Sequence, residues 1–197
     1  MNLRKLLRPL LAVCALLLTA SFGNPAVSLA QESSALPAAA SVVKTHTVVS
    51  HDPVPRGQEF QIAVVVDIIE GYHMNSHKPR ESYLIPTTLT PQLPAGFTLT
   101  DTLYPNGELK KFPFSPDKAL DVYTGSVTLR LKLHAGNTAP IGATTIPATL
   151  RYQACNNSAC LPPVRVALSV PLQIAPAGAK SKAVHPELFP AASTAQK

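Results

Sequence analysis

Two cysteines lie close together in the segment Tyr-Gln-Ala-Cys-Asn-Asn-Ser-Ala-Cys-Leu-Pro-Pro, which spans residues 152–163. A pair at this spacing, Cys155 and Cys160, can form a disulfide that either braces a loop or opens and recloses as two electrons pass. A closed loop of about six residues adds only about 2 kcal/mol of stability, which weakens the bracing interpretation. The pair is not the C-x-x-C of thioredoxins, however, and no helix follows to lower a thiol pKa. Spacing alone therefore leaves both interpretations open.

The residues before the pair predict where the two sulfurs point. Apolar side chains alternate with polar ones up to Tyr152, which indicates a strand with one buried face. Because neighbouring side chains in a strand take opposite faces, an inward Tyr152 predicts that Cys155 lies on the wet face or at the strand's end. The run Asn156-Asn157-Ser158 can turn the chain. We therefore expect Cys160 opposite Cys155 across a hairpin loop.

Period-two alternation recurs along the chain and predicts the fold class. The strong runs cover residues 60–68, 127–133, 146–152 and 164–172, and weaker runs cover 42–50, 87–89 and 98–104. No segment shows a convincing helical repeat, and 20 prolines argue against long helices. The pattern predicts an all-β protein, an antiparallel two-layer β-sandwich that is immunoglobulin-like in architecture. It lacks the tryptophan and the long-range cysteine pair of antibody domains.

The first 30 residues are typical of a cleaved signal peptide. Arg4, Lys5 and Arg8 precede an apolar run over residues 10–20, and Ser28-Leu29-Ala30 offers small residues for cleavage before Gln31. A lipoprotein anchored at Cys14 is the less favoured alternative, because Val13 is not the small residue expected before a lipidated cysteine. The apolar run is short for a transmembrane helix.

The remaining chain divides into a tether over residues 31–41, a β-sandwich over 42–175 and a disordered tail over 176–197. The tether and tail are rich in alanine and proline and lack periodicity. Without the leader, 14 basic residues face 11 acidic ones, and no basic cluster interleaves with aromatics. A nucleic-acid partner is therefore not expected. We expect an exported protein in an oxidising compartment, with no transmembrane segment in the mature chain.

Histidines and a methionine offer one further chemical possibility. His73, Met74 and His77 form the best metal candidate, since such ligands near two thiols could bind copper. Methionine is often packing material, and these residues flank an expected turn, so copper handling is a minor alternative. Motifs of serine hydrolases, zinc proteases and phosphate-binding loops are absent from the sequence. We expect no cofactor.

The cysteine segment closely resembles the redox motif of one family, the N-terminal periplasmic domain of the thiol:disulfide interchange protein DsbD. Other pieces resemble that domain in the same order. They are Gly-Tyr-His-Met-Asn-Ser over residues 71–76, Leu-Ile-Pro-Thr over 84–87, Pro-Ala-Gly-Phe over 94–97 and Asp-Val-Tyr-Thr-Gly over 121–125. The resemblance covers roughly residues 45–175. The cysteine motif is specific, and the other pieces are supportive.

The resemblance implies an immunoglobulin-like sandwich that carries one reversible disulfide in the periplasm and acts as a protein-disulfide reductase component. In the family, electrons come from a membrane-embedded thiol reductase. They pass to thioredoxin-like proteins, to disulfide isomerases and to thiol proteins of cytochrome c maturation. By the same resemblance, Cys160 forms the mixed disulfide with the recipient and Cys155 resolves it. The alternative is a non-catalytic protein-binding sandwich whose disulfide is structural.

The family also covers its cysteines with a loop that opens on contact with a partner. Its counterpart is expected within residues 110–118, where Phe112 and Phe114 are candidates to lie over the disulfide, with ordinary core packing as the alternative. The other candidate shielding or partner-binding residues are Tyr72, Tyr123, Tyr152 and Pro162.

Three departures from the family pattern stand out. Asn75 replaces a further aromatic that family members often carry after Gly-Tyr. The membrane and thioredoxin-like domains of the full-length protein do not follow, so electrons are expected to arrive from separate proteins. No acidic residue lies near the cysteines in sequence, so no proton acceptor can be named.

Overall fold

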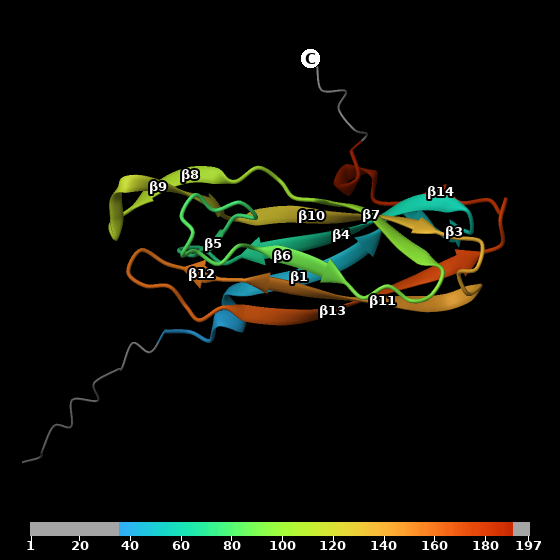
Figure 1. Cartoon of the computed structure of the whole chain (residues 1–197), viewed down its shortest axis with the longest axis horizontal. Coiled ribbons are helices and arrows are strands. Elements are labelled where there is room, and N and C mark those ends of the chain that lie inside the picture. The colour runs from blue at the N-terminus through green and yellow to red at the C-terminus, as the bar shows by residue number, and fades with distance from the viewer. Residues whose placement is uncertain (1–35, 191–197) are drawn as a thin grey trace, which may run out of the picture. The chain divides into compact units, whose positions relative to one another are not determined.

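The computed structural model describes residues 36–190, and strands dominate it (Figure 1). The predicted signal peptide, residues 31–35 of the predicted tether and residues 191–197 lie outside the described part. The strands are β1 Val43–Val49, β2 His51–Asp52, β3 Val54–Pro55, β4 Gln58–Ile68, β5 His73–Asn75, β6 Thr88–Pro91, β7 Phe97–Leu103, β8 Glu108–Phe112, β9 Ser115–Tyr123, β10 Ser126–Ala135, β11 Gly142–Tyr152, β12 Ala154–Cys155, β13 Val164–Ala175 and β14 Lys182–Ala183. Two short 3-10 turns, η1 Ala39–Val42 and η2 Pro186–Leu188, complete the set. No helix in residues 36–190 is long and apolar enough to cross a membrane.

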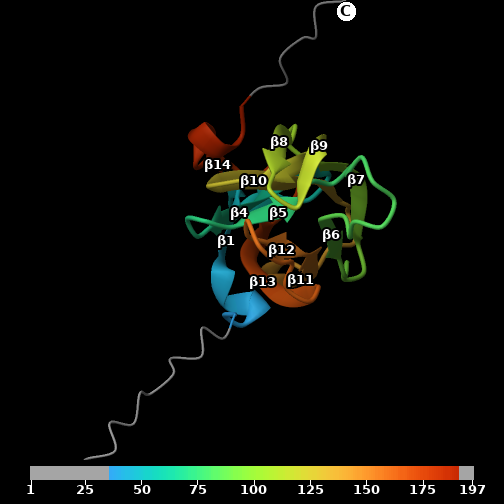
Figure 2. The same ribbon diagram turned by 90° about the vertical axis from the view of Figure 1, so that its left-hand side faces the viewer.

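Two four-stranded sheets form the sandwich. Their strand orders are β1-β4-β10-β7 and β3-β13-β11-β6. Figure 2 shows β4 and β10 in one layer, with β11 and β13 in the other. One continuous apolar core includes Ile62 and Leu131 from the first sheet and Leu150 and Val170 from the second. The prediction of an all-β, immunoglobulin-like sandwich is confirmed.

The four strong alternating runs of the sequence form strands β4, β10, β11 and β13. In β11 and β13, buried apolar residues alternate with more exposed ones, and the two strands pair antiparallel over eleven positions from Gly142↔Ile174 to Tyr152↔Val164. This is the pattern of a sheet with one face on the core and one in water. The long pairing fixes the ends of both strands, and the cysteine segment joins those ends.

A third, smaller sheet positions the cysteine segment. Its order is β12-β5-β9-β8, and these strands gather at one end of the sandwich (Figure 1). The chain leaves β11 at Tyr152 and re-enters regular pairing in β12, with Gln153 as the break between them. This small sheet brings together segments from three distant parts of the sequence.

Residues 176–190, which belong to the predicted disordered tail, contain regular structure. β14 pairs antiparallel with β2, the backbone N–H of Val184 donates to the Ser50 carbonyl at 2.9 Å, and Arg130 Nη1 donates to the Leu188 carbonyl at 3.2 Å. The physical reason is that the β2 edge offers unpaired backbone groups, which this segment satisfies. Residues 39–41, assigned to the tether, likewise lie against the domain, because the Tyr152 hydroxyl donates to the Ala39 carbonyl at 3.1 Å.

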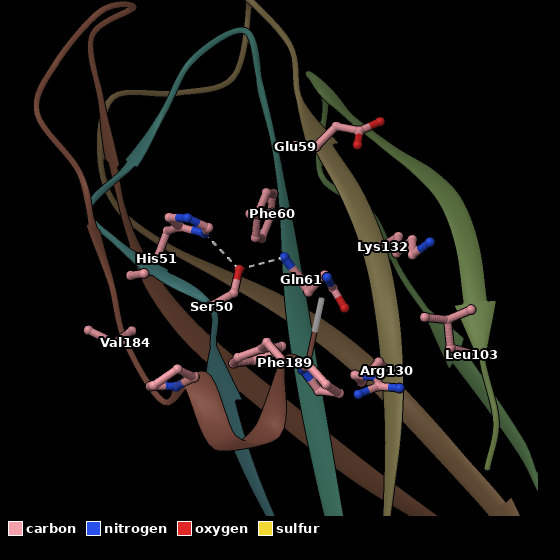
Figure 3. A pocket seen from close by; sticks show the side chains of 13 residues that line it. Ser50, His51, Glu59, Phe60, Gln61, Leu103, Arg130, Lys132, Val184 and Phe189 are labelled. Atoms are coloured by element: carbon pink, nitrogen blue, oxygen red, sulfur yellow. Dashed lines mark hydrogen bonds between the residues drawn. The ribbon is translucent and has the colours of Figure 1, made fainter. Parts of the chain in front are cut away.

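A cavity of about 640 Å³ lies between this C-terminal segment and strands β4 and β10 (Figure 3). Ser50 accepts the backbone N–H of Gln61 at 2.8 Å and lies 2.9 Å from His51 Nδ1. Phe60, Phe189 and Arg130 also line it. Neither cysteine is among the lining residues.

Candidate redox site

Cys155 and Cys160 form a disulfide at the rim of a tight loop. The sulfurs are 1.99 Å apart, and the two Cα atoms are 3.9 Å apart. Asn156 shapes the loop: its Oδ1 accepts the backbone N–H groups of Ser158 and Ala159 at 2.8 Å, and its own N–H donates to the Ala159 carbonyl at 2.9 Å. The predicted turn and the placement of Cys160 opposite Cys155 are confirmed.

The two cysteines differ sharply in their exposure. Cys160 is exposed, whereas Cys155 is only 1% exposed. Of the two predicted placements for Cys155, the wet face was wrong, whereas the end of a strand was right, because Cys155 is the last residue of β12. The wet-face prediction assumed unbroken alternation after Tyr152, but the chain changes sheets at Gln153, and Tyr152, Ala154 and Cys155 are all buried. The site thus pairs one exposed cysteine with one buried cysteine.

His73 is the cross-strand neighbour of Cys155. β12 and β5 pair antiparallel, with Ala154 opposite Met74 and Cys155 opposite His73. Directly opposed residues project to the same face of a sheet, with Cβ atoms about 4.5–5.5 Å apart. His73 is 2% exposed, and its Nε2 has no hydrogen-bond partner among the described residues. The register therefore places a buried imidazole beside the inner cysteine.

The β8–β9 hairpin covers this imidazole. Phe112 stacks on His73 with ring centroids 4.0 Å apart, and Phe114 stacks on Phe112 at 5.4 Å. Phe112 is buried in a small apolar cluster with Leu84, Leu120 and Val122, whereas Phe114 is 44% exposed. The segment expected to be a covering loop is thus a hairpin whose aromatic tip packs over the histidine that faces Cys155.

Lys110 on the same hairpin sets the charge around His73. Its Nζ lies 2.8 Å from Glu108 Oε2 and donates to Thr124 Oγ1 at 3.0 Å. Burial, aided by the positive charge of Lys110, lowers the pKa of His73 from 6.5 to about 4. The imidazole is therefore neutral at pH 7.

The other predicted partner-binding residues are spread over different surroundings. Tyr72 is half-buried and packs against the main core, and Pro162 is exposed two residues after Cys160. The hydroxyl of Tyr123 accepts the backbone N–H of His77 at 3.1 Å and donates to the Pro105 carbonyl at 3.0 Å. Tyr152 is fully buried in the main core. Tyr123 and Tyr152 therefore have internal hydrogen-bonding roles.

Asn75 occupies the position where an aromatic was expected. Its side chain is fully buried, and its Nδ2 donates to the Ile85 carbonyl at 3.0 Å. The amide therefore ties β5 to the loop that carries Ile85.

The three copper candidates have separate surroundings. His73 stacks on Phe112, while Met74 is fully buried in the main core. His77 stacks on Tyr104 at 3.6 Å, and its Nδ1 lies 3.0 Å from the Thr87 carbonyl oxygen. Within residues 36–190 no group of three or more His, Cys, Asp or Glu residues could hold a metal ion.

Comparison with known proteins agrees with the sequence motif. The family model for the N-terminal domain of the thiol:disulfide interchange protein DsbD matches residues 39–172. The chain belongs to this DsbD N-terminal domain family. The resemblance inferred from residues 152–163 is confirmed, and the chain holds a thiol:disulfide interchange domain with a Cys155–Cys160 disulfide.

Two solved structures are similar to this DsbD N-terminal-type domain. The N-terminal domain of DsbD from Neisseria meningitidis, in the reduced form, is 19% identical with a TM-score of 0.42, over 76% of this chain and 94% of that chain. The N-terminal periplasmic domain of ScsB from Proteus mirabilis is 13% identical with a TM-score of 0.44, over 66% of this chain and 46% of that chain. No curated protein sequence matches this chain.

Sequence reasoning missed the pairing of His73 with Cys155. The two residues are far apart in sequence, and their contact depends on the register of β5 with β12. From the sequence, the only role predicted for His73 was that of a metal ligand. The one usable signal was its position within the Gly-Tyr-His piece of the family pattern.

Proposed function

We propose that this domain passes electron pairs between proteins through the Cys155–Cys160 disulfide. A donor dithiol reduces the disulfide and is itself oxidised. The Cys160 thiolate then attacks a recipient disulfide, forming a mixed disulfide and releasing one recipient thiolate. Cys155 attacks the Cys160 sulfur, which restores the internal disulfide and releases the second recipient thiol. The recipient gains two electrons and two protons, and the domain returns to its oxidised form.

The unequal exposure of the two cysteine residues carries this proposal. An attacking or attacked sulfur must be reached by a partner, and Cys160 is exposed. A resolving sulfur needs only to reach its neighbour, and the buried Cys155 already lies across the loop from Cys160. A purely structural disulfide does not require this asymmetry.

Family membership supports a proposal for the partners and the compartment. We infer that the donor is a membrane-embedded thiol reductase and that the recipients are thioredoxin-like or disulfide isomerase proteins of the periplasm. The predicted signal peptide supports export. The Phe112–Phe114 tip supports a role as a cover that recipients displace, because apolar cover excludes small thiols from the inner sulfur.

Trapping of covalent partners tests the proposal. All proteins are the full chain with Cys14→Ala, so that only the site cysteines can react. The test compares this background protein with the same protein carrying Cys155→Ala. With Cys155 absent, Cys160 has no resolving thiol, and mixed disulfides should accumulate that dithiothreitol releases. The matched control is Cys160→Ala, which keeps the buried thiol and should trap far less.

A redox titration gives an independent measure. An exchanging pair should equilibrate with glutathione or dithiothreitol at a potential above about −300 mV, while a lower value marks a structural bond. Absence of trapped partners together with a potential below that limit would favour the non-catalytic protein-binding alternative.

A further inference from the structure

The imidazole of His73 is buried beside Cys155 with an unused nitrogen. His73 is 2% exposed, it pairs with Cys155 across β5 and β12, and its Nε2 has no partner among the described residues. Buried polar atoms without a partner are rare in native proteins, and each needs an explanation. The neighbour that shares its face of the small sheet is Cys155, whose thiol must lose its proton to resolve the mixed disulfide.

Cys155 needs a proton acceptor to perform resolution. Only a thiolate attacks a disulfide, and a free thiol has a pKa of about 8.5, which apolar burial raises further. Cys155 is 1% exposed, so solvent has poor access to its proton. Without help, the inner thiol would remain protonated at neutral pH.

The charged groups near His73 leave it as the available base. Lys110 on β8 is a cation, and it is paired with Glu108 on the surface of the hairpin. Glu70 and Lys110 line the same hollow as His73, and Glu70 is exposed. Phe112 covers the ring itself. In the described part of the chain, therefore, His73 is the titratable group whose strand register points it at Cys155.

We propose that His73 accepts the proton of the Cys155 thiol when Cys155 resolves the mixed disulfide, a role that rests on the proposed function. The thiol proton moves to the neutral imidazole, which gives a thiolate beside an imidazolium. The thiolate attacks the Cys160 sulfur, the Cys155–Cys160 bond forms, and the bond from Cys160 to the recipient breaks. The leaving thiolate takes up a proton, and the imidazolium returns its own to solvent.

The electrostatics of the site fit this cycle. With the disulfide closed, burial and Lys110 hold the pKa of His73 at about 4, so the imidazole carries no proton at neutral pH. A thiolate beside the ring favours the protonated imidazole, because opposite charges stabilise each other in a buried site. Once the disulfide has closed again, no thiolate charge remains beside the ring, so the imidazolium loses its proton.

A pH-jump experiment on the full chain with Cys14→Ala tests the role. The reduced protein is loaded at Cys160 with one equivalent of 4,4′-dithiodipyridine in acid, where Cys155 is protonated. It is then mixed to final values between about pH 6 and pH 9, a range that spans the free thiol pKa. Release of 4-thiopyridone reports the attack by Cys155 alone. The variant is His73→Gln, which keeps hydrogen bonding but not basicity, and the matched control is His77→Gln.

We expect His73→Gln to slow release about 100-fold near neutral pH, the lower end of what a positioned general base contributes. The difference in release rate between His73→Gln and the parent protein should become smaller as the pH rises above the thiol pKa, because the thiolate then forms without a base. His77→Gln should match the parent protein. Equal rates for His73→Gln and the parent, or a slowing that is the same at every pH, would overturn the role.

The parent protein provides a second measurement that needs no variant to fold. With His73 as the base, the rate of 4-thiopyridone release should increase with pH only up to about pH 7.5 and then stay constant. Unaided ionisation of the Cys155 thiol would instead make this rate increase beyond about pH 8.5. A release rate that still increases at about pH 8.5 would exclude His73 as the base. The assay contains no partner protein, so its outcome is independent of partner trapping. If partners are trapped but His73→Gln releases 4-thiopyridone at the parental rate, the carrier function would be supported and the role of His73 in it would be excluded.

Discussion

Phe112 lies nearly flat on His73, with ring centroids 4.0 Å apart and planes inclined by 18°. This contact joins the β8–β9 hairpin to the strand that pairs with the cysteine segment. The hairpin therefore lies over the histidine that pairs with Cys155, and its aromatic tip is the first place to probe for a covering role.

Phe112→Ala should both destabilise the domain and uncover the site. Phe112 is buried with Leu84, Leu120 and Val122, so its loss should lower the free energy of unfolding by about 3 kcal/mol. Reduction of the disulfide by dithiothreitol should become several-fold faster, because small thiols gain access. Urea denaturation and stopped-flow reduction measure the two effects.

Phe114→Ala is the matched control for Phe112. Phe114 is 44% exposed and its ring centroid is 6.4 Å from that of His73, so its removal should cost less than about 1 kcal/mol. If both variants reduced at the parental rate, the hairpin would be ordinary packing and not a cover.

The lowered pKa of His73 predicts a loss of stability in mild acid. Its pKa is about 4 in the folded protein and 6.5 in the unfolded chain. Above pH 6.5 the imidazole is neutral in both states and contributes nothing to the pH dependence. Between these two values the unfolded chain binds the extra proton, so the free energy of unfolding falls as the pH falls, until it levels off below about 4.

His73→Gln isolates this contribution. Between about pH 7 and pH 5 the parent protein should lose about 2 kcal/mol more than the variant, measured by urea denaturation at each pH. Parallel losses in the two proteins would mean that His73 is more solvated than its burial indicates.

Reduction of the disulfide should leave the domain folded. The closed loop is about six residues long, so opening it should cost only about 2 kcal/mol. The eleven-position pairing of β11 with β13 already holds the flanking strands together. Denaturation with and without a phosphine reductant, in the Cys14→Ala background, measures the difference. Collapse of the fold on reduction would identify the bond as a brace and contradict the carrier role.

Tyr123→Phe should destabilise the fold without changing the cysteine chemistry. The hydroxyl accepts the His77 N–H and donates to the Pro105 carbonyl in a buried setting, so its loss should cost about 1–3 kcal/mol. Tyr83→Phe, at a side chain that is 69% exposed, should change the stability by less than about 0.5 kcal/mol. A large change in the rate of disulfide reduction in Tyr123→Phe would instead assign this tyrosine to the site.

Local alternation was enough to predict most of the fold. The apolar runs over residues 60–68, 127–133 and 146–152 each became a strand whose inward residues are in the core. The turn at Asn156 was also predictable, because an asparagine side chain caps its own loop through local hydrogen bonds.

The details of the site depended on contacts that no local pattern encodes. The orientation of Cys155 was wrong because alternation does not show that a chain will leave one sheet for another at Gln153. The neighbour relation of His73 and Cys155 arises from strand register between distant segments. The C-terminal segment took structure from the free edge of β2, which is a property of the folded sheet and not of the tail's own composition.

Strand β5 has only three residues, yet it lies between β12 and β9 in the small sheet. The disulfide and the aromatic hairpin are thus attached to opposite sides of one short peptide, and neither can be altered by evolution without regard to the other. A relative that lengthens or shortens this peptide by a single residue would turn the imidazole away from the sulfur, and its covering hairpin would have to be rebuilt at the same time.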